Sequence, residues 1–192
     1  MQIDRILYPI TSLGPGKRIG IWTLGCLKKC PKCANPELRS FDKSKDLPIK
    51  SLDAIISFID FSIIDGITIS GGEPFCQSED LLELLVLLYR KKKDILVFTG
   101  YTFDELNFSD NPYIRECFRY IGVLVTGEYI DELNDNHTPL LASTNQEIIF
   151  LKQNLRPLYG EYQKKGRQIQ NIFHNNEMMS VGIHNREENM GK

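Results

Sequence analysis

The segment Ile19–Cys33 reads Ile-Gly-Ile-Trp-Thr-Leu-Gly-Cys-Leu-Lys-Lys-Cys-Pro-Lys-Cys. Its first six residues, Ile19–Leu24, are a short apolar run of the kind that forms a buried strand. A glycine then marks the end of the strand, and three cysteines follow within eight residues. The segment therefore predicts a strand that delivers a cysteine-rich loop to one edge of a sheet.

The alternation of strand and helix continues along the chain. Apolar runs predict further strands at Gly66–Ser70, Ile95–Thr99, Ile121–Val125 and Glu147–Leu151. Helical spacing of apolar residues predicts helices at Ser51–Phe61, Ser78–Lys92 and Pro112–Phe118. β-Branched strands that alternate with amphipathic helices are typical of a parallel sheet covered by helices. Because a full eight-unit barrel takes about 250 residues, we expect an α/β fold, an incomplete (open) βα barrel of five or six units.

The C-terminal part has a different pattern. Two strand candidates, Ile169–Phe173 and Met178–Ile183, flank His174-Asn175-Asn176-Glu177, whose asparagines favour a tight turn. We interpret this part as a β-hairpin, preceded by a linker at Leu158–Arg167 and followed by a frayed tail at Asn185–Lys192. The chain is thus expected to divide into a core domain, residues 1–155, and a C-terminal part, residues 156–192, packed on or extending from it.

Composition excludes several classes of protein. The 192 residues carry a formal net charge of -2, which does not suggest a general nucleic-acid-binding protein. No apolar run approaches the roughly 20 residues that span a membrane, and the N-terminus lacks the features of a signal peptide. We therefore expect a cytoplasmic protein with no membrane partner. In that reducing compartment its five cysteines are expected to be thiols or metal ligands.

The cysteines of the loop Gly25–Cys33, here called the cysteine loop, are Cys26, Cys30 and Cys33, separated by three and two residues. Thiolates are the natural ligands of iron–sulfur clusters, and three cysteines on four irons would leave one iron open to a small molecule. Unligated or disulfide-linked thiols are one alternative. A zinc site is another, since zinc takes four protein ligands in structural sites. Its fourth ligand would come from His137, His174, His184, Cys76 or Cys117.

Three lysines, Lys28, Lys29 and Lys32, lie between these cysteines, with no acidic residue among them. They are interpreted either as a solvated loop or as charges that hold an anionic cluster and attract an acidic electron donor such as a flavodoxin.

Three polar, glycine-rich segments each follow a predicted strand directly. They are the cysteine loop, Gly71–Pro74 and Thr99–Tyr101. Because chemistry gathers at the carboxyl ends of parallel strands, we expect all three to meet at one rim. On its own, Gly71-Gly72-Glu73-Pro74 also fits an ordinary turn from strand to helix.

The pair of Cys26-x3-Cys30-x2-Cys33 and Gly71-Gly72-Glu73-Pro74 resembles the signature of the radical S-adenosylmethionine superfamily. More narrowly, the chain is similar to the activases of glycyl radical enzymes. The segments that carry this likeness are Gly14-Pro15-Gly16-Lys17-Arg18, Trp22–Cys26, Cys33–Glu37, Thr99–Phe103, Val123–Tyr129 and Ser143–Gln146.

The resemblance implies a radical S-adenosylmethionine oxidoreductase of the activating type. Cys26, Cys30 and Cys33 would hold a [4Fe-4S] cluster, whose open iron chelates S-adenosylmethionine. Reductive cleavage would give a 5′-deoxyadenosyl radical, which takes a hydrogen atom from the substrate. The expected cofactor-binding residues are Gly71, Gly72, Glu73, Pro74, Asn35, Thr99 and Gly100. Cofactor chemistry of this kind requires no acid–base pair from the protein.

The implied partner is a large glycyl radical enzyme such as anaerobic ribonucleotide reductase. A maturase acting on a peptide or other macromolecule is an alternative, and a non-catalytic iron–sulfur or zinc module is a third. Cys76, close to the site, is either a reactive thiol or a small core residue, and Cys117 is interpreted as core.

Overall fold

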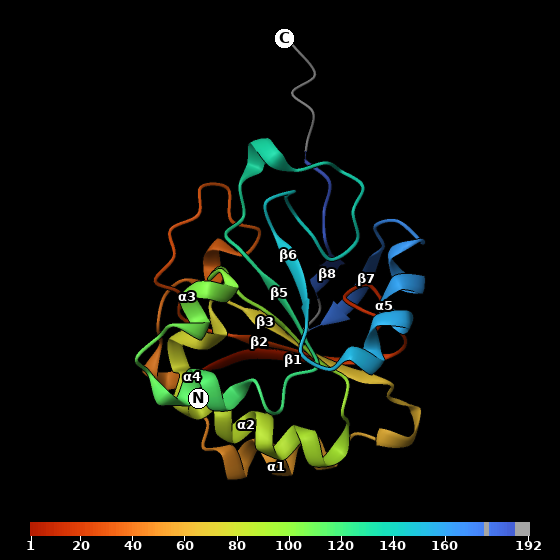
Figure 1. Ribbon diagram of the computed structural model, residues 1–192. Helices are drawn as coiled ribbons and strands as arrows, with labels where there is room; N and C mark the ends of the chain where they lie inside the picture. The colour runs from red at the N-terminus through yellow and green to blue at the C-terminus, as the bar shows by residue number, and fades with distance from the viewer. Residues whose placement is uncertain (175–176, 187–192) are drawn as a thin grey trace.

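The computed structural model describes residues 1–174 and 177–186 (Figure 1). In this part of the chain the strands are β1 (Ile3–Ile10), β2 (Arg18–Thr23), β3 (Gly66–Gly71), β4 (Ile95–Phe98), β5 (Val123–Thr126), β6 (Glu147–Phe150), β7 (Ile169–His174) and β8 (Glu177–Gly182). The α-helices are α1 (Ile49–Ser57), α2 (Ser78–Lys91), α3 (Phe103–Asn107), α4 (Pro112–Cys117) and α5 (Arg156–Gln163). Short 3-10 turns connect several of these elements.

The main sheet is mixed and has the linear order β1-β2-β3-β4-β5-β6. The four strands β2 to β5 are parallel, and the two outer strands run antiparallel to their neighbours. The carboxyl ends of the four parallel strands therefore lie along one edge of the sheet, here called the carboxyl edge. The three polar segments named above, which are the cysteine loop, Gly71–Pro74 and Thr99–Tyr101, lie at this edge.

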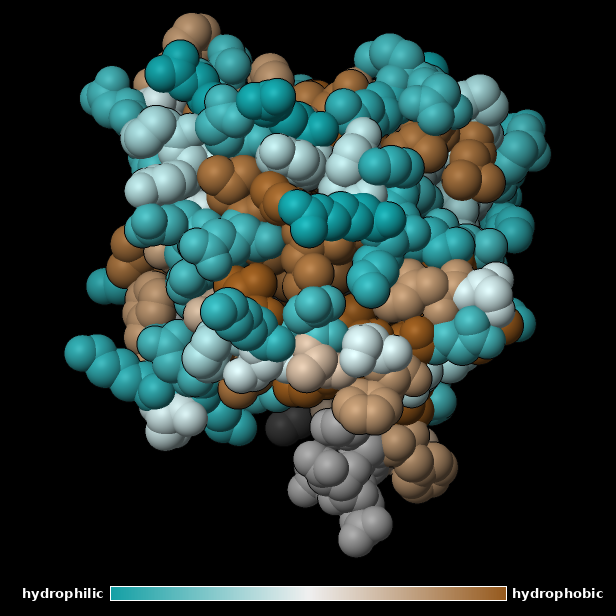
Figure 2. All heavy atoms as spheres, turned by 90° about the horizontal axis from the view of Figure 1, so that it is seen from below, coloured by the Kyte–Doolittle hydropathy of each residue, from teal (hydrophilic) through white to brown (hydrophobic). Residues whose placement is uncertain are grey.

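Helices cover one face of the sheet. Leu52 and Ile56 of α1 and an apolar stripe on α2 pack against buried side chains of β2 and β3 such as Ile21 and Ile69. The helix α2 begins at Ser78, has acidic residues in its first turn and ends with Arg90 and Lys91. Charges of these signs at the two ends interact favourably with the helix dipole and stabilise the helix. Seen from below (Figure 2), the surface is largely hydrophilic, with apolar side chains exposed near its middle.

The other face of the sheet is covered by the C-terminal part of the chain. Tyr159 and Tyr162 of α5 pack with Leu96 and Val125 of β4 and β5. The hairpin β7–β8 packs Val181 and other apolar side chains against the region of β1 and β2. Both faces of the central strands are thus buried, which explains why those strands read as continuous apolar runs.

Several expectations need correction. The strand β1 was not predicted, because Pro9 and the adjacent charged residues Asp4 and Arg5 interrupt its apolar pattern. The strand at Glu147–Leu151 was expected to extend the parallel sheet, but β6 is antiparallel to β5. The linker expected at Leu158–Arg167 is wrong over its first half, where α5 continues to Gln163. The sheet is open and linear in order, and its closure toward a barrel stays a prediction.

The expected hairpin is confirmed, since β7 and β8 pair in register from Ile169 with Gly182 to Phe173 with Met178. Its expected turn residues Asn175 and Asn176 lie outside the described residues, as does most of the expected tail, from residue 187 onward. Among the described residues, no helix is both long enough and apolar enough to cross a membrane.

A buried ion pair closes the edge of the sheet opposite the carboxyl edge. The guanidinium of Arg18 is fully buried and donates to the Asp94 carboxylate at 2.7 Å and to the Thr68 hydroxyl at 2.7 Å. The hydroxyl of Tyr159 donates to the same carboxylate at 2.7 Å. A side chain at Gly14 would collide with Arg18, so Gly14-Pro15-Gly16-Lys17-Arg18 encloses this pair. The motif therefore serves the fold at the edge remote from the cysteines.

Candidate active site

A cavity of about 480 Å³ lies at the carboxyl edge of the sheet. All three cysteines of the cysteine loop line it, together with Gly71 at the end of β3, Gly72 and Glu73 directly after it, and Thr99 and Gly100 after β4. The expected meeting of the three polar segments is therefore observed. We call this space the cysteine cavity.

Hydrogen bonds hold the cysteine loop at its start and in its middle. The amides of Gly25 and Cys26 donate to the carbonyls of Leu38 and Arg39, each at 2.9 Å. The guanidinium of Arg39 in turn donates to the carbonyl of Cys30. The loop is thus fixed by the segment that follows it in the chain, before any ligand is considered.

The fold requires glycine at positions 71 and 72, because the surrounding backbone leaves no room for a side chain. Gly71 has φ +119°, and a side chain there would collide with the backbone of Thr23. A side chain at Gly72 would collide with the carbonyl of Gly25. In their place, the Gly72 amide donates to Thr23 O at 2.8 Å and the Glu73 amide donates to Gly25 O at 2.9 Å. The glycines let the end of β3 pass close to the start of the cysteine loop.

Glu73 joins two sides of the cavity. Its side chain accepts hydrogen bonds from the Thr99 hydroxyl at 2.9 Å, the Gly100 amide at 2.7 Å and the Phe75 amide at 3.1 Å. The residue is 1% exposed, and burial raises its pKa to about 7 against the opposing effect of these bonds. Because both carboxylate oxygens already have protein donors, Glu73 fixes the turn after β4 to the turn after β3.

The other expected cofactor-binding residues differ in position. Thr99 is buried, Gly100 is open toward the cavity beside Lys28, and Asn35 lines the cavity without making a helix-cap hydrogen bond. Pro74 is buried at the start of a 3-10 turn and does not line the cavity. The side-chain amide of Asn35 is thus open to a ligand, whereas the Gly100 N–H is already bound to Glu73.

The lysines of the cysteine loop have partners within the chain. Lys28 Nζ lies 3.2 Å from the Glu105 carboxylate and 4.5 Å from the centre of the Tyr101 ring. Lys32 Nζ lies 2.7 Å from Asp131 Oδ2. Lys29 is exposed. Two of the three charges are therefore engaged in the walls of the cavity.

Asp131 is a site residue that sequence reasoning missed. Its buried carboxylate accepts hydrogen bonds from Lys32 Nζ and from the Tyr129 hydroxyl, each at 2.7 Å, and forms an ion pair with Arg186, whose Nε lies at 3.2 Å. Hydrogen bonds from Lys32 and then Tyr129 lower the pKa of Asp131. The residue ties the cysteine loop to the C-terminal segment, and its place 99 residues from Lys32 gives no signal in the sequence.

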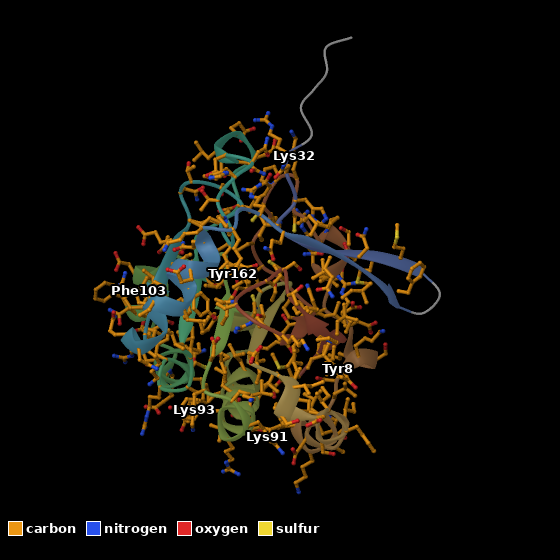
Figure 3. All side chains as sticks on the ribbon, turned by 90° about the vertical axis from the view of Figure 1, so that its right-hand side faces the viewer. Tyr8, Lys32, Lys91, Lys93, Phe103 and Tyr162 are labelled. Atoms are coloured by element: carbon orange, nitrogen blue, oxygen red, sulfur yellow. The ribbon has the colours of Figure 1, made fainter. Side chains whose placement is uncertain are left out.

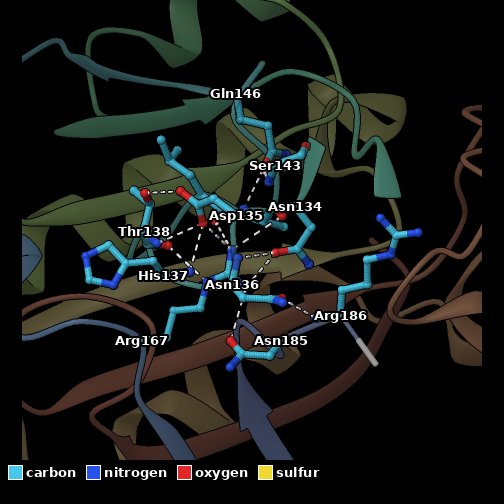
Figure 4. A network of polar contacts seen from close by, with 12 residues as sticks. Asn134, Asp135, Asn136, His137, Thr138, Ser143, Gln146, Arg167, Asn185 and Arg186 are labelled. Atoms are coloured by element: carbon cyan, nitrogen blue, oxygen red, sulfur yellow. Dashed lines mark hydrogen bonds and ion pairs between the residues drawn. The ribbon is translucent and has the colours of Figure 1, made fainter. Parts of the chain in front are cut away.

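The segment after β8 forms a further wall of the cavity, from Gly182 to Arg186. Figure 4 shows the polar network that fastens it to the loop around Asn134–Thr138. Arg167 donates to Asn134 Oδ1 at 2.8 Å, to Leu141 O at 2.8 Å and to His184 O at 3.0 Å. A side chain that the sequence places in a linker thus connects two walls of the site.

The residues considered above as a fourth zinc ligand lie at different places in the structure. Of those whose side chains the structure describes, His184 lines the cavity, with its Nε2 2.8 Å from Ser180 Oγ. Cys76 is half-buried, with its sulfur 4.0 Å from the Tyr101 hydroxyl, and burial raises the pKa of its thiol. Cys117 is fully buried, and burial raises its pKa to about 12. Cys117 is therefore a core residue, as expected.

The described residues contain no group of three His, Cys, Asp or Glu side chains that converges on a single metal ion. A cubane cluster does not need such a group, because each cysteine binds a different iron. Three thiols spread around one cavity, with no disulfide between them, fit a cluster ligand set. The fold and the site thus define a protein that binds an iron–sulfur cluster.

Comparisons with known proteins agree with this class. Residues 12–149 match the family described as a 4Fe-4S single cluster domain. An anaerobic ribonucleoside-triphosphate reductase-activating protein of Escherichia coli (strain K12) is 31% identical over 153 residues, which cover 76% of this chain and 96% of that protein. Its counterpart from Vibrio cholerae is 34% identical over 149 residues, 73% of this chain and 93% of that protein.

A pyruvate formate-lyase-activating enzyme of Staphylococcus epidermidis is 27% identical over 145 residues, which cover 71% of this chain and 55% of that protein. The chain belongs to the radical S-adenosylmethionine family of glycyl-radical-enzyme activases. It is an enzyme whose cofactors are a [4Fe-4S] cluster and S-adenosylmethionine.

Proposed function

We propose that this enzyme installs a glycyl radical on an anaerobic ribonucleoside-triphosphate reductase. The observation that carries the proposal is the cysteine cavity, where Cys26, Cys30 and Cys33 face the Gly71-Gly72 turn. Relatives named for activating that reductase cover about three quarters of the chain. The cytoplasm is the compartment we propose for this reaction, as the reduced cysteines suggest.

The chain supplies what the cluster and S-adenosylmethionine need. Cys26, Cys30 and Cys33 would hold three irons of the cluster, which leaves the fourth for the amino and carboxylate groups of S-adenosylmethionine. When bound and reduced, the cluster supplies the electron that cleaves S-adenosylmethionine to methionine and a 5′-deoxyadenosyl radical, which takes a hydrogen atom from glycine. The Asn35 amide, the strand-end backbone at Gly71 and the Gly100 carbonyl are the groups that would orient S-adenosylmethionine in the cavity.

Three features of the chain hold this arrangement before the reaction. Glu73 keeps the turns after β3 and β4 together through its hydrogen bonds to Thr99 and Gly100. Asp131 keeps the cysteine loop beside the C-terminal wall. That wall, from Gly182 to Arg186, excludes water from one side of the cavity, which protects a reactive radical from side reactions.

Two finer parts of the proposal concern the electron donor and the sheet. Lys29 is exposed on the cysteine loop, and with Lys32, which remains partly exposed, it offers positive charge to an acidic donor such as a flavodoxin. We also infer that the four parallel strands curve as an open βα barrel, with the cavity at its mouth. Both inferences rest on the placement of the cysteine loop at the carboxyl edge.

The test is anaerobic activation of the reductase. The reconstituted protein, reduced with dithionite and given S-adenosylmethionine and the reductase, is expected to produce a glycyl radical doublet in electron paramagnetic resonance. It should carry about four irons per chain, as one cubane requires. Cleavage of S-adenosylmethionine without a doublet on the reductase, but with modification of a peptide, would instead identify a maturase.

A variant of His184 tests whether one iron is left open. His184→Ala is expected to keep the iron content and the cleavage of S-adenosylmethionine, because the fourth iron is bound by the cofactor. A colourless protein with one zinc, or loss of one iron per cluster in this variant, would contradict the proposed ligand set.

A further inference from the structure

A second cavity, of about 460 Å³, lies between the hairpin and the β1–β2 side of the sheet. It shares a wall with the cysteine cavity, because Asn35, Ser70, Phe98 and the residues Gly182–His184 line both. Its other walls include Trp22 and Leu13. We call this second cavity the β8 groove. Nothing in the reaction proposed above uses it.

The groove follows the edge of a strand. Every residue from Met178 to His184 lines it, whereas none of the described side chains of β7 does. Side chains alternate between the two faces of a strand, so a cavity on one face would meet every second residue. Contact with consecutive residues therefore means that the groove runs along the free edge of β8. Figure 3 shows the hairpin from the side, running outward from the body of the protein.

The backbone groups along this edge are open to a partner. The Val181 carbonyl accepts from the Ser12 hydroxyl at 2.7 Å, and Ser12 belongs to neither strand of the hairpin. We take this carbonyl to face the free edge of β8. Because backbone groups in an antiparallel pair alternate in direction by residue, the N–H and carbonyl of Met179 would then face the same edge. Among the described residues, the backbone bonds of β8 otherwise go to β7. Such an edge pairs readily with an extended segment of another chain.

We propose that the β8 groove binds an extended segment of the glycyl radical enzyme, which adds to the edge of β8 as a third strand. The inference rests on the proposed function, in which the reacting atom is a backbone Cα of a polypeptide. A segment along β8 would pass from Met178, which is 65% exposed, to Gly182 at the cysteine cavity. Pairing through the backbone gives affinity, and the Trp22 and Leu13 side chains give an apolar wall for alternate side chains.

One wall of the groove, from Met178 to His184, belongs to the C-terminal part of the chain. The match to the 4Fe-4S single cluster family ends at residue 149, before α5 and the hairpin. A buried network anchors α5 through Tyr159, and Gln170 of β7 binds the Thr11 amide at 2.8 Å. The strand that forms the groove is thus held rigidly against the catalytic part, as a binding element requires.

A pair of proline variants tests the groove. Proline lacks the backbone N–H, so Met179→Pro removes a donor from the free edge of β8. Ile172→Pro on β7 is the matched control, because Ile172 lies opposite Met179 in the register. If the Met179 N–H faces the free edge of β8, the Ile172 N–H faces the outer edge of β7. Both side chains are partly buried against the same apolar cluster, so the structural cost is similar.

The variants are compared at equal bound cluster, with the glycyl radical doublet as readout. Loss of one backbone hydrogen bond predicts that Met179→Pro raises the KM for the reductase roughly three- to tenfold. Ile172→Pro is expected to leave that KM near the wild-type value. Equal KM values for the two variants would overturn the inference while leaving the proposed function intact.

Amide hydrogen exchange provides a measurement that does not depend on radical formation or on a folded proline variant. On addition of the reductase to the cluster-loaded wild-type protein, exchange at Met179 and Val181 is expected to slow at least roughly tenfold, as new strand pairing would cause. Exchange at Ile172 should change little. No slowing with the reductase bound would refute the groove, as would equal slowing by S-adenosylmethionine alone or by self-association. Absence of the doublet in the wild type would instead refute the proposed function.

Discussion

Glu73 and Asp131 are both buried carboxylates at the cysteine cavity, yet they hold different parts of it. Glu73 accepts two of its three hydrogen bonds from the turn after β4. Asp131 binds charged groups from the cysteine loop and from the C-terminal wall. At the scale of single residues, the cavity is therefore shaped by side chains whose polar atoms are already engaged, and the cysteines remain free for a cluster.

Single cysteine variants test the ligand assignment. Replacing Cys26, Cys30 or Cys33 by Ala is expected to abolish cluster binding and cleavage of S-adenosylmethionine, because each removes one of three thiolate ligands. Cys117→Ala, a change in the buried core on α4, should leave cleavage largely intact. The measurements are iron per chain and methionine released under dithionite. Retained cleavage in the Cys30 variant would contradict the assignment.

Asp131→Asn tests the contact between two walls. The variant keeps the size of the side chain but removes the charge that binds Lys32 and Arg186. Mutation of residues that orient metal ligands typically lowers metal affinity by about 10- to 100-fold. We expect Asp131→Asn to lower cluster affinity by roughly tenfold. The rate of iron loss to a chelator measures it. Glu132→Gln, at the adjacent exposed position, is the control and should behave as wild type.

At the scale of elements, α5 links the sheet to the hairpin. Tyr159 is fully buried, packs edge-on against Phe150 and donates to Asp94. Burial raises the pKa of Tyr159 well above its ordinary value of 10. The helix has eight residues and no side-chain hydrogen bond at its N-cap, Leu155. Its position therefore depends on the packing of this tyrosine more than on helix propensity.

Tyr159→Phe is expected to lower the free energy of unfolding by about 1.5–3 kcal/mol at neutral pH, because the lost hydrogen bond goes to a buried carboxylate. Its pH dependence has a definite sign. The folded-state pKa is raised, so the contribution of Tyr159 to stability is complete below pH 10 and is lost as the pH rises above that value. The variant should therefore lose less stability than wild type in alkaline solution. Urea unfolding measures this, and Tyr8→Phe, at a half-exposed tyrosine, serves as control.

At the scale of the whole molecule, the two edges of the sheet have separate roles. The carboxyl edge holds the cysteine cavity, and the opposite edge holds the buried pair of Arg18 and Asp94. The motif Gly14-Pro15-Gly16-Lys17-Arg18 contributed to the family resemblance, but its conformation serves the opposite edge. Resemblance alone does not distinguish a residue that holds the fold from one that meets a cofactor.

Arg18→Met separates these roles. Removing one partner of a buried ion pair leaves Asp94 uncompensated, and we expect a loss of about 3–5 kcal/mol in the free energy of unfolding. Cleavage of S-adenosylmethionine per bound cluster should be unchanged at low temperature, where the variant remains folded. A variant that keeps its stability, or a folded variant with a raised KM for S-adenosylmethionine, would show that this edge has another role.

Local sequence patterns were sufficient for much of the fold. The four parallel strands, the helix α2 and the hairpin each have a periodicity or turn composition that belongs to a short segment, and each was predicted close to its observed bounds. The same holds for the placement of the three polar segments at one edge, because a parallel sheet brings the ends of its strands together. The strand β1 and the helix α5 lack such local signals, since Pro9 and Gly160 interrupt them.

By itself, the sequence determined the family resemblance and with it the expected cluster chemistry, because the cysteine spacing and the Gly71-Gly72 pair at the end of β3 are properties of contiguous residues. Only the tertiary structure decided what surrounds that chemistry. Asp131 meets Lys32 across 99 residues of chain, Arg167 joins two walls, and β8 presents its free edge to a groove that opens into the cysteine cavity. Long-range contacts of this kind depend on how helices and strands pack together after they form. That packing produces no periodic pattern in a single sequence.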